Sequence, residues 1–236
     1  MTAAYSDAFA ELVATPPRRL RPADVGDSIV RASDPSLREI IRHGLPRRGL
    51  SDEVNDWRAR NAPNLWRGAR RVLLARSFNL PTVYGALWLR VIRGNGEEVD
   101  LGLASLRVVT TAGMNYLVDA FQNITELENF KYHGLGTGST AEASSDTALG
   151  TELTTQYSVD NTRATGSQGE GASANIYRTS GTITVDASVS AREHGVFTSP
   201  TVGSGTLLDR SVFALVSLNA SDSLATPYEY TSVAGS

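Results

Sequence analysis

The stretch "YGALWLRVIRGNGEEVDLGLASLRVVTT", residues 84–111, indicates the fold class most directly. It contains two apolar runs on either side of the tripeptide Gly94-Asn95-Gly96. A tight turn between antiparallel strands needs residues that accept positive φ, and an Asn-Gly pair between two apolar runs meets that need. The sequence therefore predicts a β-hairpin here.

The residues that follow the hairpin predict one short helix. In "TTAGMNYLVDAFQN", residues 110–123, Met114, Leu117, Val118 and Phe121 recur at helical spacing behind two threonines that can cap the helix. We expect this amphipathic helix to cover an apolar surface.

The remaining C-terminal residues read as short strands. Residues 179–197, "TSGTITVDASVSAREHGVF", alternate between apolar and polar side chains and predict a strand with one buried face. Residues 205–233 supply two or three more strands. Because no long helices alternate with them, residues 81–236 are predicted to form a mainly β domain, an antiparallel, jelly-roll-like β-sandwich with one short helix.

Residues 1–80 are interrupted by prolines and predict an extended N-terminal arm with short helices. One helix of about two turns should have Asp34 as its N-cap and Pro35 as its first residue, and a second should begin with Ser51 in "SDEVNDWRARN", residues 51–61. Helices this short need a surface to pack on, so Trp57 and Trp66 should contact either this chain or a partner.

Charge is distributed unevenly along the chain. Residues 1–80 contain fourteen arginines against nine acidic residues, a balance of +5, whereas residues 81–236 contain eight basic and sixteen acidic residues, a balance of −8. This asymmetry favours head-to-tail protein contacts, and nucleic-acid binding is not expected because the whole chain is acidic. The residues expected to bind a partner are Arg18, Arg19, Arg21, Arg47 and Arg48 as charged contacts and Trp57 and Trp66 as apolar anchors.

The composition excludes several classes of chemistry. There is no cysteine, which excludes disulfides, thiolate zinc sites and cysteine nucleophiles. No run of eighteen apolar residues occurs, and the first residues lack the pattern of a signal peptide, so neither a membrane span nor secretion by that route is expected.

The glycine-rich stretch at residues 129–153, "NFKYHGLGTGSTAEASSDTALGTEL", raises the question of a phosphate site. It lacks the third glycine of a dinucleotide fingerprint and the Gly-Lys-Ser/Thr of a P-loop. We therefore expect a structural loop, in which glycines allow close backbone approach or positive φ.

The titratable residues give no recognisable catalytic or metal motif. His43, His133 and His194 are scattered, and for the pair Glu193-His194 we expect a hydrogen bond at the end of a strand. No catalytic residue, metal or cofactor is predicted. An acid–base pair of the glycosidase type stays open for the carboxylates Asp146, Glu152, Asp186 and Asp209.

Residues 83–236 resemble structural proteins of tailed bacteriophages. Those proteins share the order of a hairpin, a "T-x-A-G" helix start (residues 110–113), a "G-x-G-x-T" loop (136–140) and "D-T-A-L" (146–149). The match continues in a Glu-x-Gly strand, a Leu-Leu-x-Arg strand and a "D-S-L" turn.

The resemblance implies a non-enzymatic virion protein, assembled in the host cytoplasm, that decorates the capsid or belongs to the tail or a fibre. Its partners would be other virion proteins (capsid, neck or tail subunits) and copies of itself, with a trimer favoured. Two alternatives stay open, a hydrolase that acts on cell-wall sugar and a tip module that binds carbohydrate or a receptor. The second would need exposed aromatic side chains, for which the candidates are Tyr132, Tyr157, Tyr177, Tyr228 and Tyr230.

Overall fold

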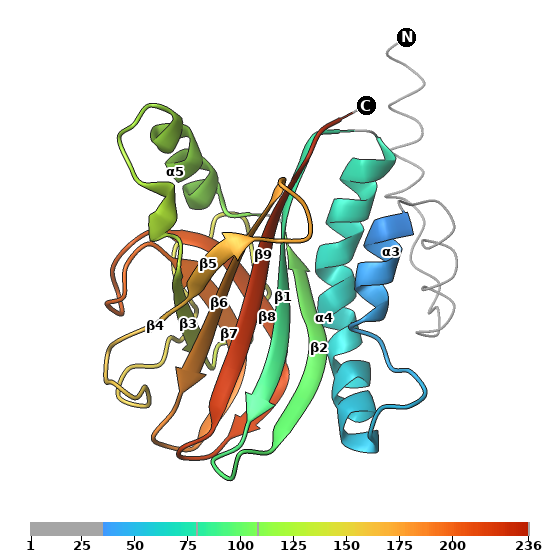
Figure 1. The fold of residues 1–236 in the computed structure, drawn as a ribbon, viewed down its shortest axis with the longest axis vertical. Helices are drawn as coiled ribbons and strands as arrows, with labels where there is room; N and C mark the ends of the chain where they lie inside the picture. The colour runs from blue at the N-terminus through green and yellow to red at the C-terminus, as the bar shows by residue number, and fades with distance from the viewer. Residues whose placement is uncertain (1–34, 79, 108, 236) are drawn as a thin grey trace. The chain divides into compact units, whose positions relative to one another are not determined.

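Two antiparallel sheets pack face to face in the computed structural model, which describes residues 35–78, 80–107 and 109–235 (Figure 1). One sheet has five strands in the order β2-β1-β9-β6-β5, and the other has four in the order β4-β3-β7-β8. The predicted antiparallel β-sandwich is confirmed. The strands are β1 (Thr82–Ile92), β2 (Glu98–Arg107), β3 (Tyr132–Gly136), β4 (Ala164–Thr165), β5 (Ser167–Glu170), β6 (Ile176–Thr184), β7 (Val189–Phe197), β8 (Leu207–Leu218) and β9 (Ser223–Val233). The helices are α3 (Pro35–Arg42), α4 (Asp52–Ser77), α5 (Thr111–Phe121) and the 3₁₀ helix η1 (Leu127–Asn129).

The predicted hairpin is formed by β1 and β2, which pair directly. Its turn is closed by the Arg93 N–H, which donates to the Glu97 carbonyl oxygen at 2.8 Å. Gly96 has φ +86°, a backbone conformation that side chains disfavour. The main core lies between this hairpin and the facing sheet and includes Leu87, Leu89 and Phe213.

The prediction of one strand across residues 179–197 is wrong. The stretch forms the end of β6 and all of β7, which belong to different sheets. The chain passes from one sheet to the other at residues 185–188. At the start of this crossing the Val185 N–H donates to the Asp222 carbonyl oxygen, directly beyond the last pair of β6 and β9. Because Ile183, Val185 and Val189 are buried on both sides of this crossing, the alternating pattern continues through it.

The second predicted helix begins where expected but is much longer. Its N-cap is Ser51, whose side chain accepts a hydrogen bond from the Val54 N–H at 3.3 Å. The helix α4 then runs for 26 residues and passes through Pro63. A proline inside a helix costs about 3 kcal/mol. Burial of the apolar side chains that follow, at about 1.5–3 kcal/mol for each large one, outweighs that cost. These side chains belong to Leu65, Trp66, Val72 and Leu73.

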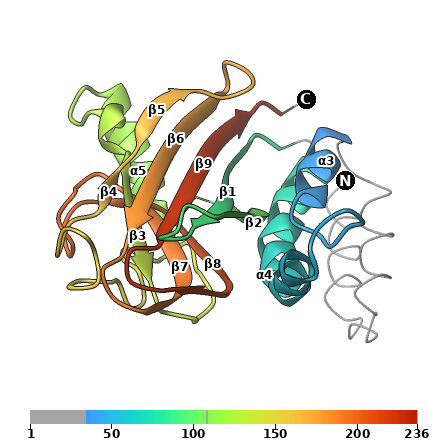
Figure 2. The same ribbon diagram turned by 60° about the horizontal axis from the view of Figure 1, so that its bottom comes forward.

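α4 covers the side of the sandwich where the edge strands β2 and β8 lie (Figure 1, Figure 2). The buried Asn61 side chain bonds to both strands: its Nδ2 donates to the Ala104 carbonyl oxygen at 2.8 Å, and its Oδ1 accepts from the Ala214 N–H at 2.9 Å. An unpaired edge strand is a site of unwanted pairing with other chains. Asn61 satisfies polar groups on both edges at once.

Three further side chains satisfy backbone oxygens of these edges. The Trp57 indole N–H donates to the Ala214 carbonyl oxygen at 3.1 Å. Arg58 donates to Leu101 on β2, and Arg107 donates to Val212 on β8. α4 is therefore part of the same hydrogen-bonded structure as the sheets.

Replacing Asn61 with alanine is expected to lower the free energy of unfolding by about 2–4 kcal/mol, because a buried N–H and a buried carbonyl lose their partners. Asn64→Ala is the control, since the Asn64 side chain accepts one hydrogen bond from Arg67 at a partly buried position. Urea unfolding would measure both. Equal losses in the two variants would contradict the role given to Asn61.

Candidate functional site

The glycine-rich loop at residues 137–151 surrounds a carboxylate of the chain itself. Glu193 on β7 is fully buried and accepts backbone N–H bonds from Gly138 at 2.9 Å, Gly150 at 2.9 Å and Thr151 at 2.7 Å. A Cβ atom on Gly136 or Gly138 would collide with the Glu193 side chain. The predicted structural role of the glycines is confirmed as close approach, and the anion that the loop binds is Glu193.

Arg210 on β8 neutralises this carboxylate. Its Nε and Nη2 atoms lie 2.8 Å and 2.7 Å from Glu193 Oε2. Its Nη1 atom donates to Asp146 at 3.0 Å, and Nη2 also donates to the Thr140 carbonyl oxygen at 3.2 Å. Arg210 therefore holds both the start and the middle of the loop against β7 and β8.

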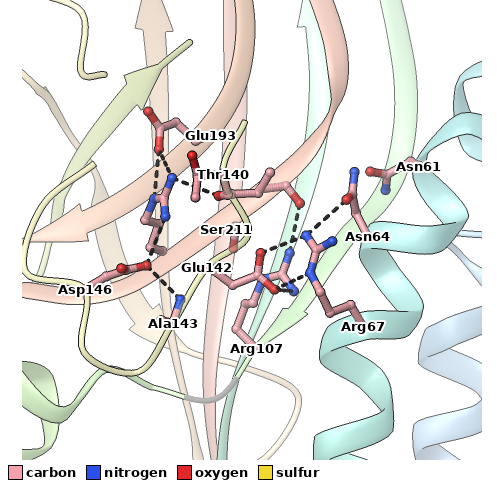
Figure 3. Close-up of polar contacts among 12 residues, drawn as sticks. Asn61, Asn64, Arg67, Arg107, Thr140, Glu142, Ala143, Asp146, Glu193 and Ser211 are labelled. Carbon is pink, nitrogen blue, oxygen red and sulfur yellow. Dashed lines mark hydrogen bonds and ion pairs between the residues drawn. The ribbon is translucent and has the colours of Figure 1, made fainter. Parts of the chain in front are cut away.

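The middle of the loop is also bonded to α4 and β2 through Glu142. Arg67 on α4 donates to both carboxylate oxygens, at 3.0 Å and 2.9 Å, and Arg107 Nη1 lies 2.5 Å from Oε1 (Figure 3). Burial alone would raise the pKa of Glu142, but the hydrogen bond from Arg67 and the charge of Arg107 lower it below its ordinary value. Burial lowers the pKa of Arg107 to about 10. We call these six residues the buried ion network: Arg67, Arg107, Glu142, Asp146, Glu193 and Arg210.

Four of the sequence motifs quoted above meet in this network. The "G-x-G-x-T" loop, "D-T-A-L" and Glu-x-Gly motifs contribute Thr140, Asp146 and Glu193, each of which accepts a hydrogen bond from Arg210 of the Leu-Leu-x-Arg motif. Residues far apart in the chain therefore hold one loop in place.

Two histidines form a buried polar pair between the sheets. His133 Nδ1 on β3 lies 3.0 Å from His194 Nε2 on β7, and the hydroxyls of Thr179 and Thr226 lie 3.1 Å and 2.9 Å from the His133 ring nitrogens. Burial lowers the pKa of His133 to about 3, and burial together with the His133 charge lowers that of His194 well below its ordinary value. The prediction that Glu193 and His194 lie at a strand end is wrong, since both lie inside β7, but both side chains are hydrogen-bonded as expected. His43 is exposed after α3.

Asp209 is a second buried titratable group. Its carboxyl accepts hydrogen bonds from the Tyr228 hydroxyl at 3.2 Å and the Ser211 hydroxyl at 3.3 Å. Burial raises the pKa of Asp209 to about 7, and the charge of Arg107 only partly opposes this rise. A substrate would reach Asp209 or the histidine pair only if the sandwich opened.

The other carboxylates considered for acid–base chemistry have separate surroundings. Glu152 forms a buried ion pair with Arg163, with contacts of 2.6 Å and 2.9 Å, and the Arg163 guanidinium stacks 3.5 Å from the Phe197 ring. Asp146 is bonded to Arg210, and Asp186 is exposed. The structure therefore gives each candidate its own environment rather than a shared cleft.

The residues predicted to bind a partner lie in different settings. Arg47 and Arg48 are exposed in the connection between α3 and α4, whereas Trp57 is buried in the main core of the sandwich and Trp66 is also buried. The surface that the tryptophans needed is thus supplied by the chain itself. Arg18, Arg19 and Arg21 lie outside the described residues.

The tyrosines considered for carbohydrate binding are divided between core and surface. Tyr157 and Tyr228 are buried in the core. Tyr132 is half-buried, and Tyr177 and Tyr230 are half-buried where they line an apolar cavity.

That cavity lies beneath α5 and has a volume of about 500 Å³. The Thr110 cap predicted for α5 is confirmed, since its hydroxyl accepts from the Gly113 N–H at 3.0 Å. As expected, α5 lies on an apolar surface, since Tyr116 packs against the cluster that contains Phe130 and Leu208, and Leu117 faces the cavity. Its other large apolar side chains, Met114, Val118 and Phe121, are exposed. We call the exposed apolar group the α5 patch: Met114, Val118, Phe121, Ile124 and Leu127.

The cavity itself is lined by Leu117, Leu127, Phe130, Tyr177, Leu208 and Tyr230, with Glu128, Gln168 and Gly169 beside them.

A second exposed apolar group lies at the C-terminal end of α4 and is called the α4 patch. It consists of Leu74, Phe78 and Leu80. Contiguous exposed apolar side chains on a folded protein mark sites of protein interaction. Sequence reasoning missed both patches, because an amphipathic pattern does not reveal whether its apolar face is covered.

Comparisons with known proteins give no family assignment. No protein-family model matches this sequence, and a search of curated proteins finds no significant match. Within the part of the chain that the structure describes, no helix is long and apolar enough to cross a membrane. The same residues contain no cluster of three or more His, Asp or Glu side chains placed to hold a metal ion.

Proposed function

We propose that this chain is a non-enzymatic structural protein of a tailed phage virion, serving as a capsid decoration protein or as a component of the tail or a fibre. It assembles with copies of itself and is held to neighbouring virion proteins by its N-terminal residues. The observation that carries the proposal is the pair of exposed apolar patches on a sandwich whose edges and main loop are bonded internally.

The placement of the charged residues supports a structural role. The carboxylates and guanidiniums contributed by the motifs that resemble phage proteins bond to one another inside the molecule. Such buried pairs fix the conformation of a loop and are costly to break. A virion component gains from this rigidity, because its surface must present the same contacts in every copy.

Attachment through the N-terminal residues follows from multivalency. Each copy contributes weak contacts through its arginines, and linkage of several copies raises the effective concentration of the remaining contacts. Total attachment can then be strong although each contact is exposed to solvent and screened by salt.

Replacing Arg18, Arg19 and Arg21 together with alanine is expected to reduce attachment to particles about tenfold or more, because several charge contacts of up to about 1 kcal/mol each are lost. The midpoint of urea unfolding should stay unchanged. The control replaces Arg90 and Arg178, whose ion pairs with Glu98 and Glu229 are on the sandwich surface. Unchanged occupancy of the triple variant on purified particles would remove the N-terminal arginines from the attachment mechanism.

A further inference from the structure

The two apolar patches carry charges of opposite sign. Beside the α5 patch, the exposed acids Glu126 and Glu128 are accompanied by the half-buried Asp119, and Glu128 lines the edge of the cavity. The nearby Lys131 is half-buried, with its ammonium 6.0 Å from the Tyr132 ring centre. The α5 patch is therefore apolar at its centre and acidic at its edge.

The α4 patch has a basic edge. From residue 58 to its end, α4 contains six arginines and no acidic residue. Arg58 is buried and Arg67 is bonded to Glu142, but Arg70 and Arg71 are exposed one turn before the patch. The Phe78 and Leu80 side chains are 55% and 51% exposed.

Size and chemistry fit the α4 patch to the cavity beneath α5. The cavity volume of about 500 Å³ is within the usual range for sites that enclose a compact apolar group. Its lining is aromatic and aliphatic, which suits the Phe78 ring, and Arg70 and Arg71 would then lie near Glu126 and Glu128. Aromatic side chains that fill pockets, together with complementary charges, are typical of the residues that dominate binding.

The two patches lie on opposite sides of the sandwich, since α5 and α4 flank it from different sides in both views (Figure 1, Figure 2). They cannot meet within one copy, so an α4 patch that fills the cavity must belong to another molecule. A second copy of this chain supplies that chemistry.

We infer that copies of this chain associate head to tail, with Phe78 and Leu80 of one copy bound in the apolar cavity beneath α5 of the next. This inference rests on the proposed function, for which it specifies the contact between copies. A head-to-tail contact closes into a ring when the rotation between copies permits and otherwise extends as a filament.

The test uses two full-length variants, each with one substitution in one of the two patches. Phe78→Asp places an acid where the cavity edge is acidic, and Leu127→Arg places a charge at the cavity mouth beside the incoming arginines. Both positions are exposed, so the fold should persist. Val159→Asp is the control because Val159 is a 71% exposed apolar residue outside both patches.

Sedimentation velocity would measure the mass of each variant and of an equal mixture. We expect each variant alone to stay at the monomer mass of 25.2 kDa, because every contact needs both patches. The mixture should form a dimer and nothing larger, since Phe78 of the Leu127→Arg variant can still bind the intact cavity of the other. Val159→Asp should associate like the unaltered chain.

Either variant alone associating like the unaltered chain would overturn the inference while leaving self-assembly in the proposed function intact. A mixture that stays monomeric, when the unaltered chain associates, would also overturn it. If the unaltered chain is itself monomeric, both the inference and the self-assembly in the proposed function fail.

Charge reversal tests the edges of the same contact. Arg70→Glu with Arg71→Glu should weaken association at least tenfold, and adding Glu126→Arg and Glu128→Arg in the same chain should restore it. Restoration requires that the two edges meet, so weakening without recovery would contradict the proposed pairing.

Discussion

The Glu193→Ala variant is expected to lose about 3–5 kcal/mol of the free energy of unfolding, because removing one partner of a buried ion pair leaves the other uncompensated. Arg210 would keep its positive charge in a buried position with only Asp146 as a carboxylate partner. The backbone N–H groups of Gly138, Gly150 and Thr151 would lose their acceptor at the same time.

Glu98→Ala is the matched control for this variant. Glu98 also pairs with an arginine, Arg90, at 3.0 Å, but both side chains are about half exposed. Exposed ion pairs contribute about 0–1 kcal/mol, so the control should unfold near the unaltered chain. Urea unfolding would compare the two variants, with the slope of the unfolding free energy against urea concentration held equal. Amide exchange at residues 137–151 should accelerate in Glu193→Ala. A loss below about 1 kcal/mol for Glu193→Ala would contradict the anchoring role.

The second large effect is a loss of stability between pH 6.5 and pH 4.5. The pKa values of His133 and His194 are lowered in the folded protein by burial, that of His133 to about 3. As the pH falls below 6.5, the unfolded chain binds two protons that the folded protein does not. Each such proton destabilises the folded state by about 1.4 kcal/mol per pH unit.

Asp209 acts in the opposite direction over the same interval. Because burial raises its pKa to about 7, the folded protein binds a proton there that the unfolded chain, with an ordinary value of 3.8, does not. One of the two histidine contributions is therefore cancelled. The net loss from pH 6.5 to pH 4.5 is expected to be about 3 kcal/mol. Glu142, whose pKa is lowered, adds to the loss only below this interval.

Two variants separate these contributions. Asp209→Asn removes the opposing group, so the loss between pH 6.5 and pH 4.5 should approach about 5 kcal/mol. His194→Gln removes one histidine and should make stability nearly independent of pH in this interval. The measurement is urea unfolding at three pH values for each protein. Stability that stays constant or rises on acidification of the unaltered chain would show that the histidines are not held neutral.

Local signals in the sequence were sufficient to predict the hairpin and the N-caps of α4 and α5. Gly94, Asn95 and Gly96 specify the turn chemically, and Ser51 and Thr110 lie directly before the helices that they cap. These features depend on neighbours within a few residues. The sequence therefore reveals them without knowledge of the fold.

Features that depend on tertiary contacts were not predictable in the same way. Pro63 indicated the end of a helix, but the burial of Leu65 and Val72 continues it. Alternation across Val185 indicated one strand, because it does not reveal that the chain changes sheets.

The buried ion network was hidden for a related reason. Glu193 and Gly138 are separated by 55 residues, and no local pattern states that the glycines of the loop surround that carboxylate. The motifs quoted in the sequence analysis include Asp146, Glu193 and Arg210. Their joint role became clear only from the bonds between them.

Light scattering on the full chain over a range of concentrations tests self-assembly most directly. We expect the mass of an oligomer, two or more times 25.2 kDa, with a trimer favoured. The reason is that the α4 and α5 patches need a second copy to be covered. A single species of 25.2 kDa at every concentration that stays soluble would contradict assembly through these patches.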